Sequence, residues 1–151
     1  MVKGDSSHEE LIRRGRRLYE RFRYEQALPF FQEAFQQATN CPAAIYNLAN
    51  TLHMLDREQE AHSLLLKLIR MDDTALDAGC LILRQPSSFR VDALYLMFHV
   101  LLYWRRSWLK AFPYAKMHLK CRKRGLKSAW SARCIRREIV ELRANFAGLK
   151  A

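Results

Sequence analysis

Residues 44–70 have the sequence AIYNLANTLHMLDREQEAHSLLLKLIR. Apolar residues recur three and four positions apart on both sides of Asp56, which places them on one face of a helix before it and one face of a helix after it. Asp56 also stands three residues before Gln59, the spacing of a helix N-cap and its capping partner. Helices this short are not stable alone in water, so the stretch predicts a helical hairpin that packs against neighbours.

The same pattern occurs 34 residues earlier in the chain. The aligned pairs agree in residue type: Leu11 and Ile45, Gly15 and Ala49, Leu18 and Leu52, Ala27 and Ala61, Phe31 and Leu65. A period of 34 residues made of helix, turn and helix is typical of tetratricopeptide arrays. Over residues 8–71 the chain therefore resembles the tetratricopeptide repeat family. The resemblance implies a scaffold that binds other proteins rather than a catalyst.

Composition favours an all-α protein. The chain has 151 residues, half of them apolar, with only five glycines and four prolines. Pro29 falls inside an expected helix, where members of the resembled family commonly carry a proline, and Pro42 suits the first turn of the next helix. We expect a single domain of about eight helices over residues 1–151, arranged as a right-handed superhelical solenoid of antiparallel helix hairpins.

The 34-residue period fails after Arg70, but a displaced copy follows. Trp108, Ala111 and Pro113 have the spacing of Tyr24, Ala27 and Pro29. The expected parts are repeat 1 at about 8–41, repeat 2 at about 42–72, an inserted helix at about 74–83, a degenerate repeat 3 at about 89–124 and a capping helix at about 127–147. A rival division pairs 74–83 with 89–104, and 107–124 with the last helix.

The sequence indicates neither secretion nor a membrane span. Its start, MVKGDSSHEE, lacks an apolar core, and the longest mostly apolar run, residues 93–104, is too short to cross a bilayer. Cys41, Cys80, Cys121 and Cys134 are scattered, which favours buried thiols in a reducing compartment. We expect a cytoplasmic protein.

The first helices of the hairpins supply the candidate binding residues. In arrays of the resembled family these helices line a concave groove. At the 34-residue offset, Arg13 would lie beside Asn47 and Arg16 beside Asn50, forming a ladder of donors suited to a peptide carboxylate or to backbone carbonyls. The candidate groove residues are Arg13, Arg16, Tyr19, Tyr46, Asn47, Asn50 and His53. The alternative is that the arginines are only solvated.

Basic charge gathers in the last third of the chain. Residues 105–151 contain fourteen of the 26 Lys and Arg residues and two acidic ones, for a net charge of +12, whereas residues 1–104 carry −1. This asymmetry favours an acidic partner, which could be a nucleic acid, an anionic lipid or an acidic protein. The candidate patch consists of Lys120, Arg122, Lys123, Arg124, Arg133, Arg136 and Arg137. Interleaved aromatic residues (Trp104, Trp108, Tyr114 and Trp130) could stack on bases, although their spacing also suits a helical core.

Catalysis has little support in the sequence. The five histidines show no metal-ligand spacing and no local carboxylate partner, and there is no phosphate-binding loop or nucleophile motif. We expect no enzyme activity, no cofactor and no metal. Function is expected to be that of an interaction adaptor for a protein or peptide, with a basic RNA- or DNA-binding module as the alternative.

Oligomeric state depends on the apolar stretch 89–104. In one interpretation, some of Tyr95, Phe98, Leu102 and Trp104 remain uncovered and form a homodimer interface. In the other, the inserted helix buries them.

Overall fold

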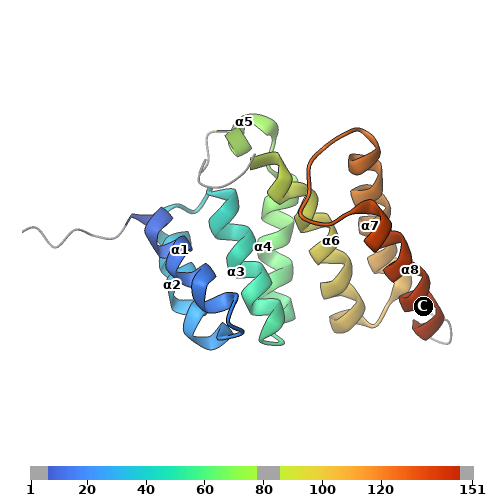
Figure 1. The fold of residues 1–151 in the computed structure, drawn as a ribbon, viewed down its shortest axis with the longest axis horizontal. Coiled ribbons are helices and arrows are strands. Elements are labelled where there is room, and N and C mark those ends of the chain that lie inside the picture. The colour runs from blue at the N-terminus through green and yellow to red at the C-terminus, as the bar shows by residue number, and fades with distance from the viewer. Residues whose placement is uncertain (1–6, 78–85, 147–151) are drawn as a thin grey trace, which may run out of the picture.

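The computed structural model describes residues 7–77 and 86–146. Within these residues the chain forms eight helices and no strand. They are α1 (His8–Tyr19), α2 (Tyr24–Gln37), α3 (Pro42–Met54), α4 (Glu58–Arg70), α5 (Asp73–Asp77), α6 (Pro86–Arg105), α7 (Trp108–Lys123) and α8 (Ala132–Phe146). Figure 1 shows them as successive antiparallel pairs in a row, with α8 at one end. The predicted all-α hairpin architecture is confirmed.

The first hairpin depends on one close helix crossing. The Ser7 hydroxyl caps α1 by accepting a bond from the Glu10 amide at 3.4 Å. A Cβ on Gly15 would lie 2.7 Å from Cε1 of the Phe31 ring, so only glycine lets α2 approach α1 this closely. Pro29 lies within α2 as expected. The small residue late in the first helix thus has a packing reason.

The turn of the second hairpin differs from the prediction. Asp56 is not the N-cap of α4: its φ is 58°, and Arg57 is the capping residue, with no side-chain cap bond. A tight turn between α3 and α4 needs a left-handed residue, which aspartate tolerates better than most. The aspartate therefore serves the turn, and α4 begins at Glu58.

The same turn geometry occurs in three hairpins. Left-handed residues join α1 to α2, α3 to α4 and α6 to α7: Phe22, Asp56 and Arg106. Five positions after each is a fully buried alanine: Ala27, Ala61 and Ala111. Because the spacing from the second to the third turn equals that between the corresponding alanines, we propose that α6 and α7 are a third repeat.

Helix α6 is buried along most of its length. Tyr95, Phe98 and Leu102 are at most 2% exposed, so the predicted dimer patch at these residues is wrong. Among the described residues their cover comes mainly from α3, α4 and α7, which pack against α6, and α5 also contacts α6. The expected inserted helix appears only as the short α5, and the rest of its predicted range, 78–83, lies outside the described residues.

The segment before α8 is tied to α6. Asp92 accepts bonds from the Ser128 hydroxyl and from the Ala129 amide, the latter at 3.0 Å. These bonds hold residues 128 and 129 outside a helix, so α8 begins at Ala132 rather than near residue 127 as predicted. The Ser131 hydroxyl then accepts from the Cys134 amide at 3.1 Å. Gly125, with φ of 84°, follows the end of α7.

The thiols are less uniform than predicted. Cys41 is buried, Cys121 is half-buried and Cys134 is exposed, so burial is wrong for Cys134, which lies on the outer face of α8. All three are free thiols. Cys80 lies outside the described residues.

Candidate partner-binding groove

Two cavities follow the first helices of the hairpins. One, of about 220 Å³, is lined by Tyr19 of α1, by residues of α3 and α6, by Trp130 and by Glu138 of α8. The other, of about 340 Å³, is lined by residues of α1, α3 and α6 and by Ala129. Tyr19 and Tyr46 line both cavities, so together they form one groove along the array.

Helices α1 and α3 meet through Tyr19 and Asn50. Their side chains are hydrogen-bonded, and burial together with nearby Tyr24 raises the pKa of the Tyr19 phenol to about 12. The phenol therefore remains protonated at physiological pH and provides a neutral, rigid wall. The aromatic rings of Tyr19 and Tyr24 lie 5.0 Å apart, edge to face, which supports its position.

The cavities bring together residues of α1 and α3 that are 31 positions apart. Arg16 shares one cavity with Asn47, and Tyr19 shares the other with Asn50. Successive repeats are rotated against each other, so equivalent positions need not stand level. The Asn47 amide donates to the Ala43 carbonyl at 2.7 Å and therefore serves α3 itself. Arg13 lines neither cavity and lies 3.8 Å from Glu10.

Two histidines in the groove have carboxylate neighbours, contrary to the prediction that no histidine has one nearby. The His53 Nδ1 atom lies 2.8 Å from both carboxylate oxygens of Glu58, across the turn from α3 to α4. The His99 Nε2 atom lies 3.2 Å from the Glu138 carboxylate, which a gap of 39 positions concealed. Burial nevertheless lowers the pKa of His99 to about 4 and outweighs the carboxylate, so His99 is neutral at pH 7.

Aromatic side chains form the wall on the α6 side. The Tyr95 ring lies 4.8 Å from the His99 ring and 5.5 Å from the Trp130 ring. Trp130 is 44% exposed and thus presents part of its indole to the groove. Arg16, in the neighbouring cavity, is 3.8 Å from Glu20; its side chain is half-buried, whereas that of Glu20 is exposed. The groove therefore combines aromatic surface with a few polar groups, as ligand-binding clefts commonly do.

Several groove residues could not be found from the sequence repeat of 34. They are Glu20, Phe89, Tyr95, Leu96, His99, Trp130 and Glu138. The 50-residue offset that links Ala61 to Ala111 also links Tyr46 to Leu96 and would have indicated the α6 residues. Trp130 and Glu138 follow the last hairpin, and no spacing in the sequence points to them.

The seven basic candidates lie at the end of α7 and on α8. All are exposed except Arg122, which is half-buried and donates to the Leu126 carbonyl at 2.6 Å. Arg137 lies 4.0 Å from Glu141 of the same helix. Among the four aromatic candidates, Trp104, Trp108 and Tyr114 are half-buried and only Trp130 is exposed. The candidate patch is therefore an exposed basic face with little free aromatic surface.

The described residues contain neither a metal-binding cluster nor a membrane-spanning helix. No group of three or more His, Cys, Asp or Glu side chains in residues 7–77 and 86–146 is placed to hold a metal ion. Over the same residues, no helix has both the length and the apolar character needed to cross a membrane.

Comparison with known proteins identifies the repeats. A profile described as tetratricopeptide repeat matches residues 18–78, which contain the end of α1 and all of α2 to α5. No curated protein and no solved structure matches the chain significantly. The profile begins near the end of α1 and covers both hairpin turns at Phe22 and Asp56, where the 34-residue period is clearest. The match supports a tetratricopeptide repeat protein over residues 18–78.

Proposed function

We propose that this protein is an interaction adaptor that holds a peptide segment of a partner protein in its groove. Tetratricopeptide repeats generally mediate protein–protein interaction, and proteins of this family are generally non-enzymatic scaffolds. The observation that supports the groove as the binding site is its composition: α1, α3, α6 and α8, with the segment before α8, line its two adjoining cavities. An extended segment could contact four helices in turn.

The groove offers two kinds of contact to such a segment. Met54 and Trp130, both more than 40% exposed, supply apolar and aromatic surface. Arg16 and His53 supply polar groups beside it. Tryptophan and arginine dominate the binding energy of many protein interfaces because each covers a large area with little loss of entropy. The proposal therefore assigns the main contacts to Trp130 and Arg16.

A peptide selection tests this proposal. A display library of random peptides is selected on the full chain, and the affinity of the enriched peptides is measured by fluorescence anisotropy. We expect Trp130→Ala to weaken binding at least tenfold, about 1.4 kcal/mol, as loss of a central aromatic contact does. Arg16→Ala should also weaken it.

Arg13→Ala is the matched control, because Arg13 is an exposed arginine on the same helix that lines neither cavity. It should bind like the unmodified chain. If Arg16→Ala and Trp130→Ala bind the selected peptides as tightly as Arg13→Ala, the groove is not the binding site.

Nucleic-acid binding remains the second candidate function, supported by one observation. Six of the seven basic candidates on α7, α8 and the turn after α7 are exposed, so phosphate groups could reach them. We rank it lower because the aromatic residues of this region are largely packed.

We also propose a cytoplasmic location. Free thiols at Cys41, Cys121 and the exposed Cys134 are expected to persist in a reducing compartment. Fractionation of cells expressing the tagged chain would test this placement.

A further inference from the structure

We propose that the groove between α7 and α8 docks an acidic amphipathic helix of a partner protein. This site lies at the end of the array and is separate from the groove along the first helices. The docked helix would take the place that the second helix of a further hairpin would occupy. Three observations support this: an empty helix position, exposed apolar side chains and a basic rim.

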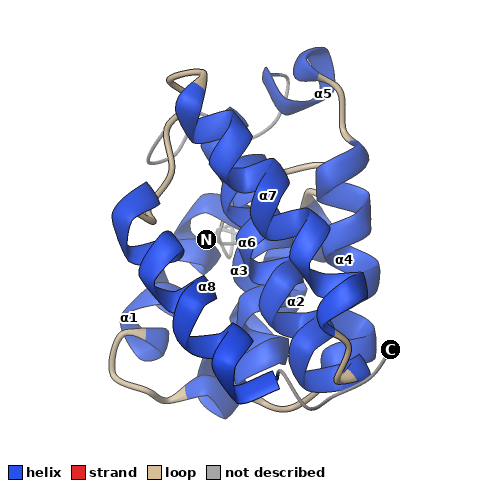
Figure 2. Cartoon of the chain, turned by 90° about the vertical axis from the view of Figure 1, so that its right-hand side faces the viewer, coloured by secondary structure: helices blue, strands red, loops and turns tan. Residues whose placement is uncertain are grey.

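The empty position follows from the packing order. Helix α2 packs on α1, α4 on α3, and α7 on α6, so each first helix has a partner from its own hairpin. Helix α8 packs on α7, and no further helix covers the two among the described residues. Figure 2, seen from this end, shows α7 and α8 side by side at the surface. A helix laid against them would continue the array.

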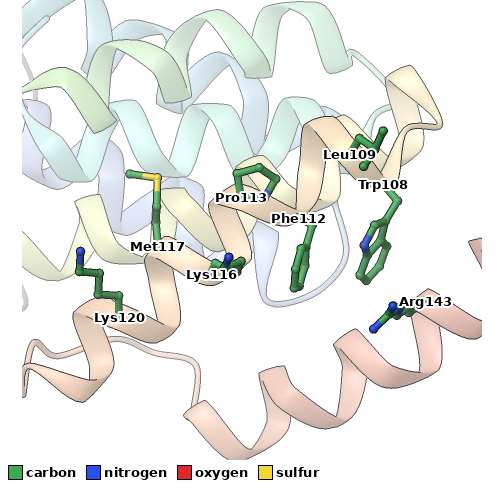
Figure 3. A pocket seen from close by; sticks show the side chains of 8 residues that line it. All are labelled: Trp108, Leu109, Phe112, Pro113, Lys116, Met117, Lys120 and Arg143. Atoms are coloured by element: carbon green, nitrogen blue, oxygen red, sulfur yellow. The ribbon is translucent and has the colours of Figure 1, made fainter. Parts of the chain in front are cut away.

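The groove has the size and apolar character of a helix-binding site. Its volume is about 780 Å³, and Trp108, Leu109, Phe112, Pro113 and Met117 of α7 line it. Leu109 is 66% exposed and Met117 46% exposed. In Figure 3 the Trp108 and Phe112 rings point into the space between the two helices. Amphipathic helices bind such grooves by inserting apolar residues spaced three and four apart.

Helix α8 contributes to the same surface. Arg143 lines the groove opposite Trp108, as Figure 3 shows. Val140 and Arg136 precede it by three and seven positions and so share its helical face. Val140 is 69% exposed. The face combines an uncovered apolar side chain with arginines at both ends.

The charge of the rim selects the partner. Lys116, Lys120 and Arg143 line the groove, and none of its eight lining residues is acidic. The two acidic residues of α8 lie outside the lining: Glu138 lies 3.2 Å from His99, and Glu141 lies 4.0 Å from Arg137. A helix with glutamate or aspartate beside its apolar stripe would match this rim, whereas a basic helix would be repelled.

Other occupants fit less well. A nucleic acid could pair with the three basic side chains but would leave Leu109 and Met117 uncovered. A second copy of this chain would bring the same basic face against itself, in a protein whose net charge is already +11. An acidic amphipathic helix would cover the apolar side chains of the groove and pair with its basic side chains.

The test is a selection among helical peptides. A display library fixes leucine at positions i, i+3, i+4 and i+7 and lets each flanking position be Glu, Gln or Lys. Selection on the full chain should enrich Glu at the flanking positions. The enriched peptide should bind at least tenfold more tightly than its Lys counterpart, as measured by anisotropy.

Two double variants separate the groove from general charge. Lys116→Glu/Lys120→Glu reverses the rim and should enrich Lys-flanked peptides instead. Lys110→Glu/Lys123→Glu makes the same charge change at exposed positions of α7 outside the groove lining and should leave the Glu preference intact. Circular dichroism would confirm that both variants remain helical.

Several results would overturn the proposal. The proposal fails if the selection enriches no helical peptide, or if both double variants respond in the same way. It also fails if a single-stranded oligonucleotide displaces the selected peptide and Lys116→Glu/Lys120→Glu abolishes binding of that oligonucleotide. Concentration-dependent dimerisation abolished by Met117→Glu would assign the groove to a second copy. The acidic-helix proposal is supported if Leu109→Glu and Met117→Glu each abolish binding of the selected peptide.

Discussion

Gly15 is the position in the first hairpin where helix packing leaves no room for a side chain. Glycine inside a helix normally costs about 1 kcal/mol relative to alanine. Here the close Phe31 ring leaves no room for a Cβ, and Phe31 is fully buried in the core. Residue choice at this position is therefore decided by helix packing and not by helix propensity.

Gly15→Ala is expected to destabilise the protein. The added methyl group would lie 2.7 to 3.0 Å from three atoms of the Phe31 ring, and overpacking of this kind typically costs about 1–3 kcal/mol. The better helix propensity of alanine offsets only part of this cost. Urea unfolding of the variant measures the net change in the free energy of unfolding.

Phe31→Leu provides the coupled control. It removes the ring that the new methyl group meets, so Gly15→Ala in the Phe31→Leu background should cost less than in the unmodified chain. Equal costs in both backgrounds would show that the Gly15–Phe31 contact is not the cause.

Residue identity predicted some positions and not others. Gly15 and Ala27 were recognisable because a close crossing admits only small side chains. Asp56 was misassigned because aspartate suits both an N-cap and a left-handed turn, and only the backbone angle distinguishes them. The Tyr19–Asn50 bond depends on the rotation between repeats, which residue spacing alone does not define.

At the level of elements, α6 is distinctive because it is buried along most of its length and yet carries polar groups. Its Asp92 binds the segment before α8, and its Tyr95 ring lies 5.6 Å from the ring of His118 on α7. The His118 Nε2 atom is 3.0 Å from the Ser128 hydroxyl. The buried His118 and the half-buried His99, which lies 3.2 Å from Glu138 of α8, therefore stand at the junction of α6, α7 and α8.

Acidification should weaken this junction. Burial lowers the pKa values of His99 and His118 to about 4, below the unfolded value near 6.5. Their stability contribution is therefore complete above pH 6.5 and is lost as the pH falls toward 4, because the unfolded chain binds protons that the folded chain does not. At about 1.4 kcal/mol per pKa unit, each histidine costs on the order of 3 kcal/mol by pH 4. The raised pKa of Glu138 offsets part of this loss.

Unfolding measured from pH 7 to pH 4 checks the sign. His118→Leu, which places a leucine where Leu68 stands in the preceding repeat, should reduce the dependence of unfolding free energy on pH. His8→Gln at the start of α1 is the control and should not reduce it. The histidine explanation fails if His118→Leu and the unmodified chain show the same slope.

The elements themselves were mostly predictable. The helices α1 to α4, α6 and α7 follow the apolar periodicity and the proline and glycine positions. The start of α8 was not predictable, because it depends on bonds from Asp92 to a segment 36 positions later. The burial of α6 by α3, α4 and α7 is likewise a tertiary effect that its uniform apolar sequence does not specify.

At the scale of the whole molecule, the two proposed binding surfaces differ in charge. The groove along the first helices has few charged groups and neutral aromatic walls. The groove at the end of the array lies in the third of the chain that carries a net charge of +12. The sequence revealed this asymmetry of charge but not the α7–α8 groove, which exists only because α8 packs beside α7.

Ionic strength should distinguish the two surfaces kinetically. Opposite charges accelerate association, and salt screens this attraction beyond about 8 to 10 Å. For an acidic helix bound between α7 and α8, the association rate constant should therefore fall several-fold from low to physiological salt, while the dissociation rate constant changes little. For a peptide in the first groove, both constants should change little. Stopped-flow anisotropy with both peptides gives the four rate constants.

The same range of salt concentrations also distinguishes peptide binding from nucleic-acid binding. A single-stranded oligonucleotide that releases counterions from several phosphates would lose affinity by orders of magnitude over this range, with a logarithmic slope of about −0.7 per phosphate contacted. We expect an oligonucleotide to bind weakly at physiological salt and to be displaced by the acidic helix. If it binds more tightly than either peptide and loses binding in Lys120→Glu/Arg136→Glu but not in Trp130→Ala, the basic face of α7 and α8 is a nucleic-acid site and the adaptor function is wrong. If salt slows both peptides equally, the net charge of +11 steers every ligand and the two grooves are not distinguished by charge.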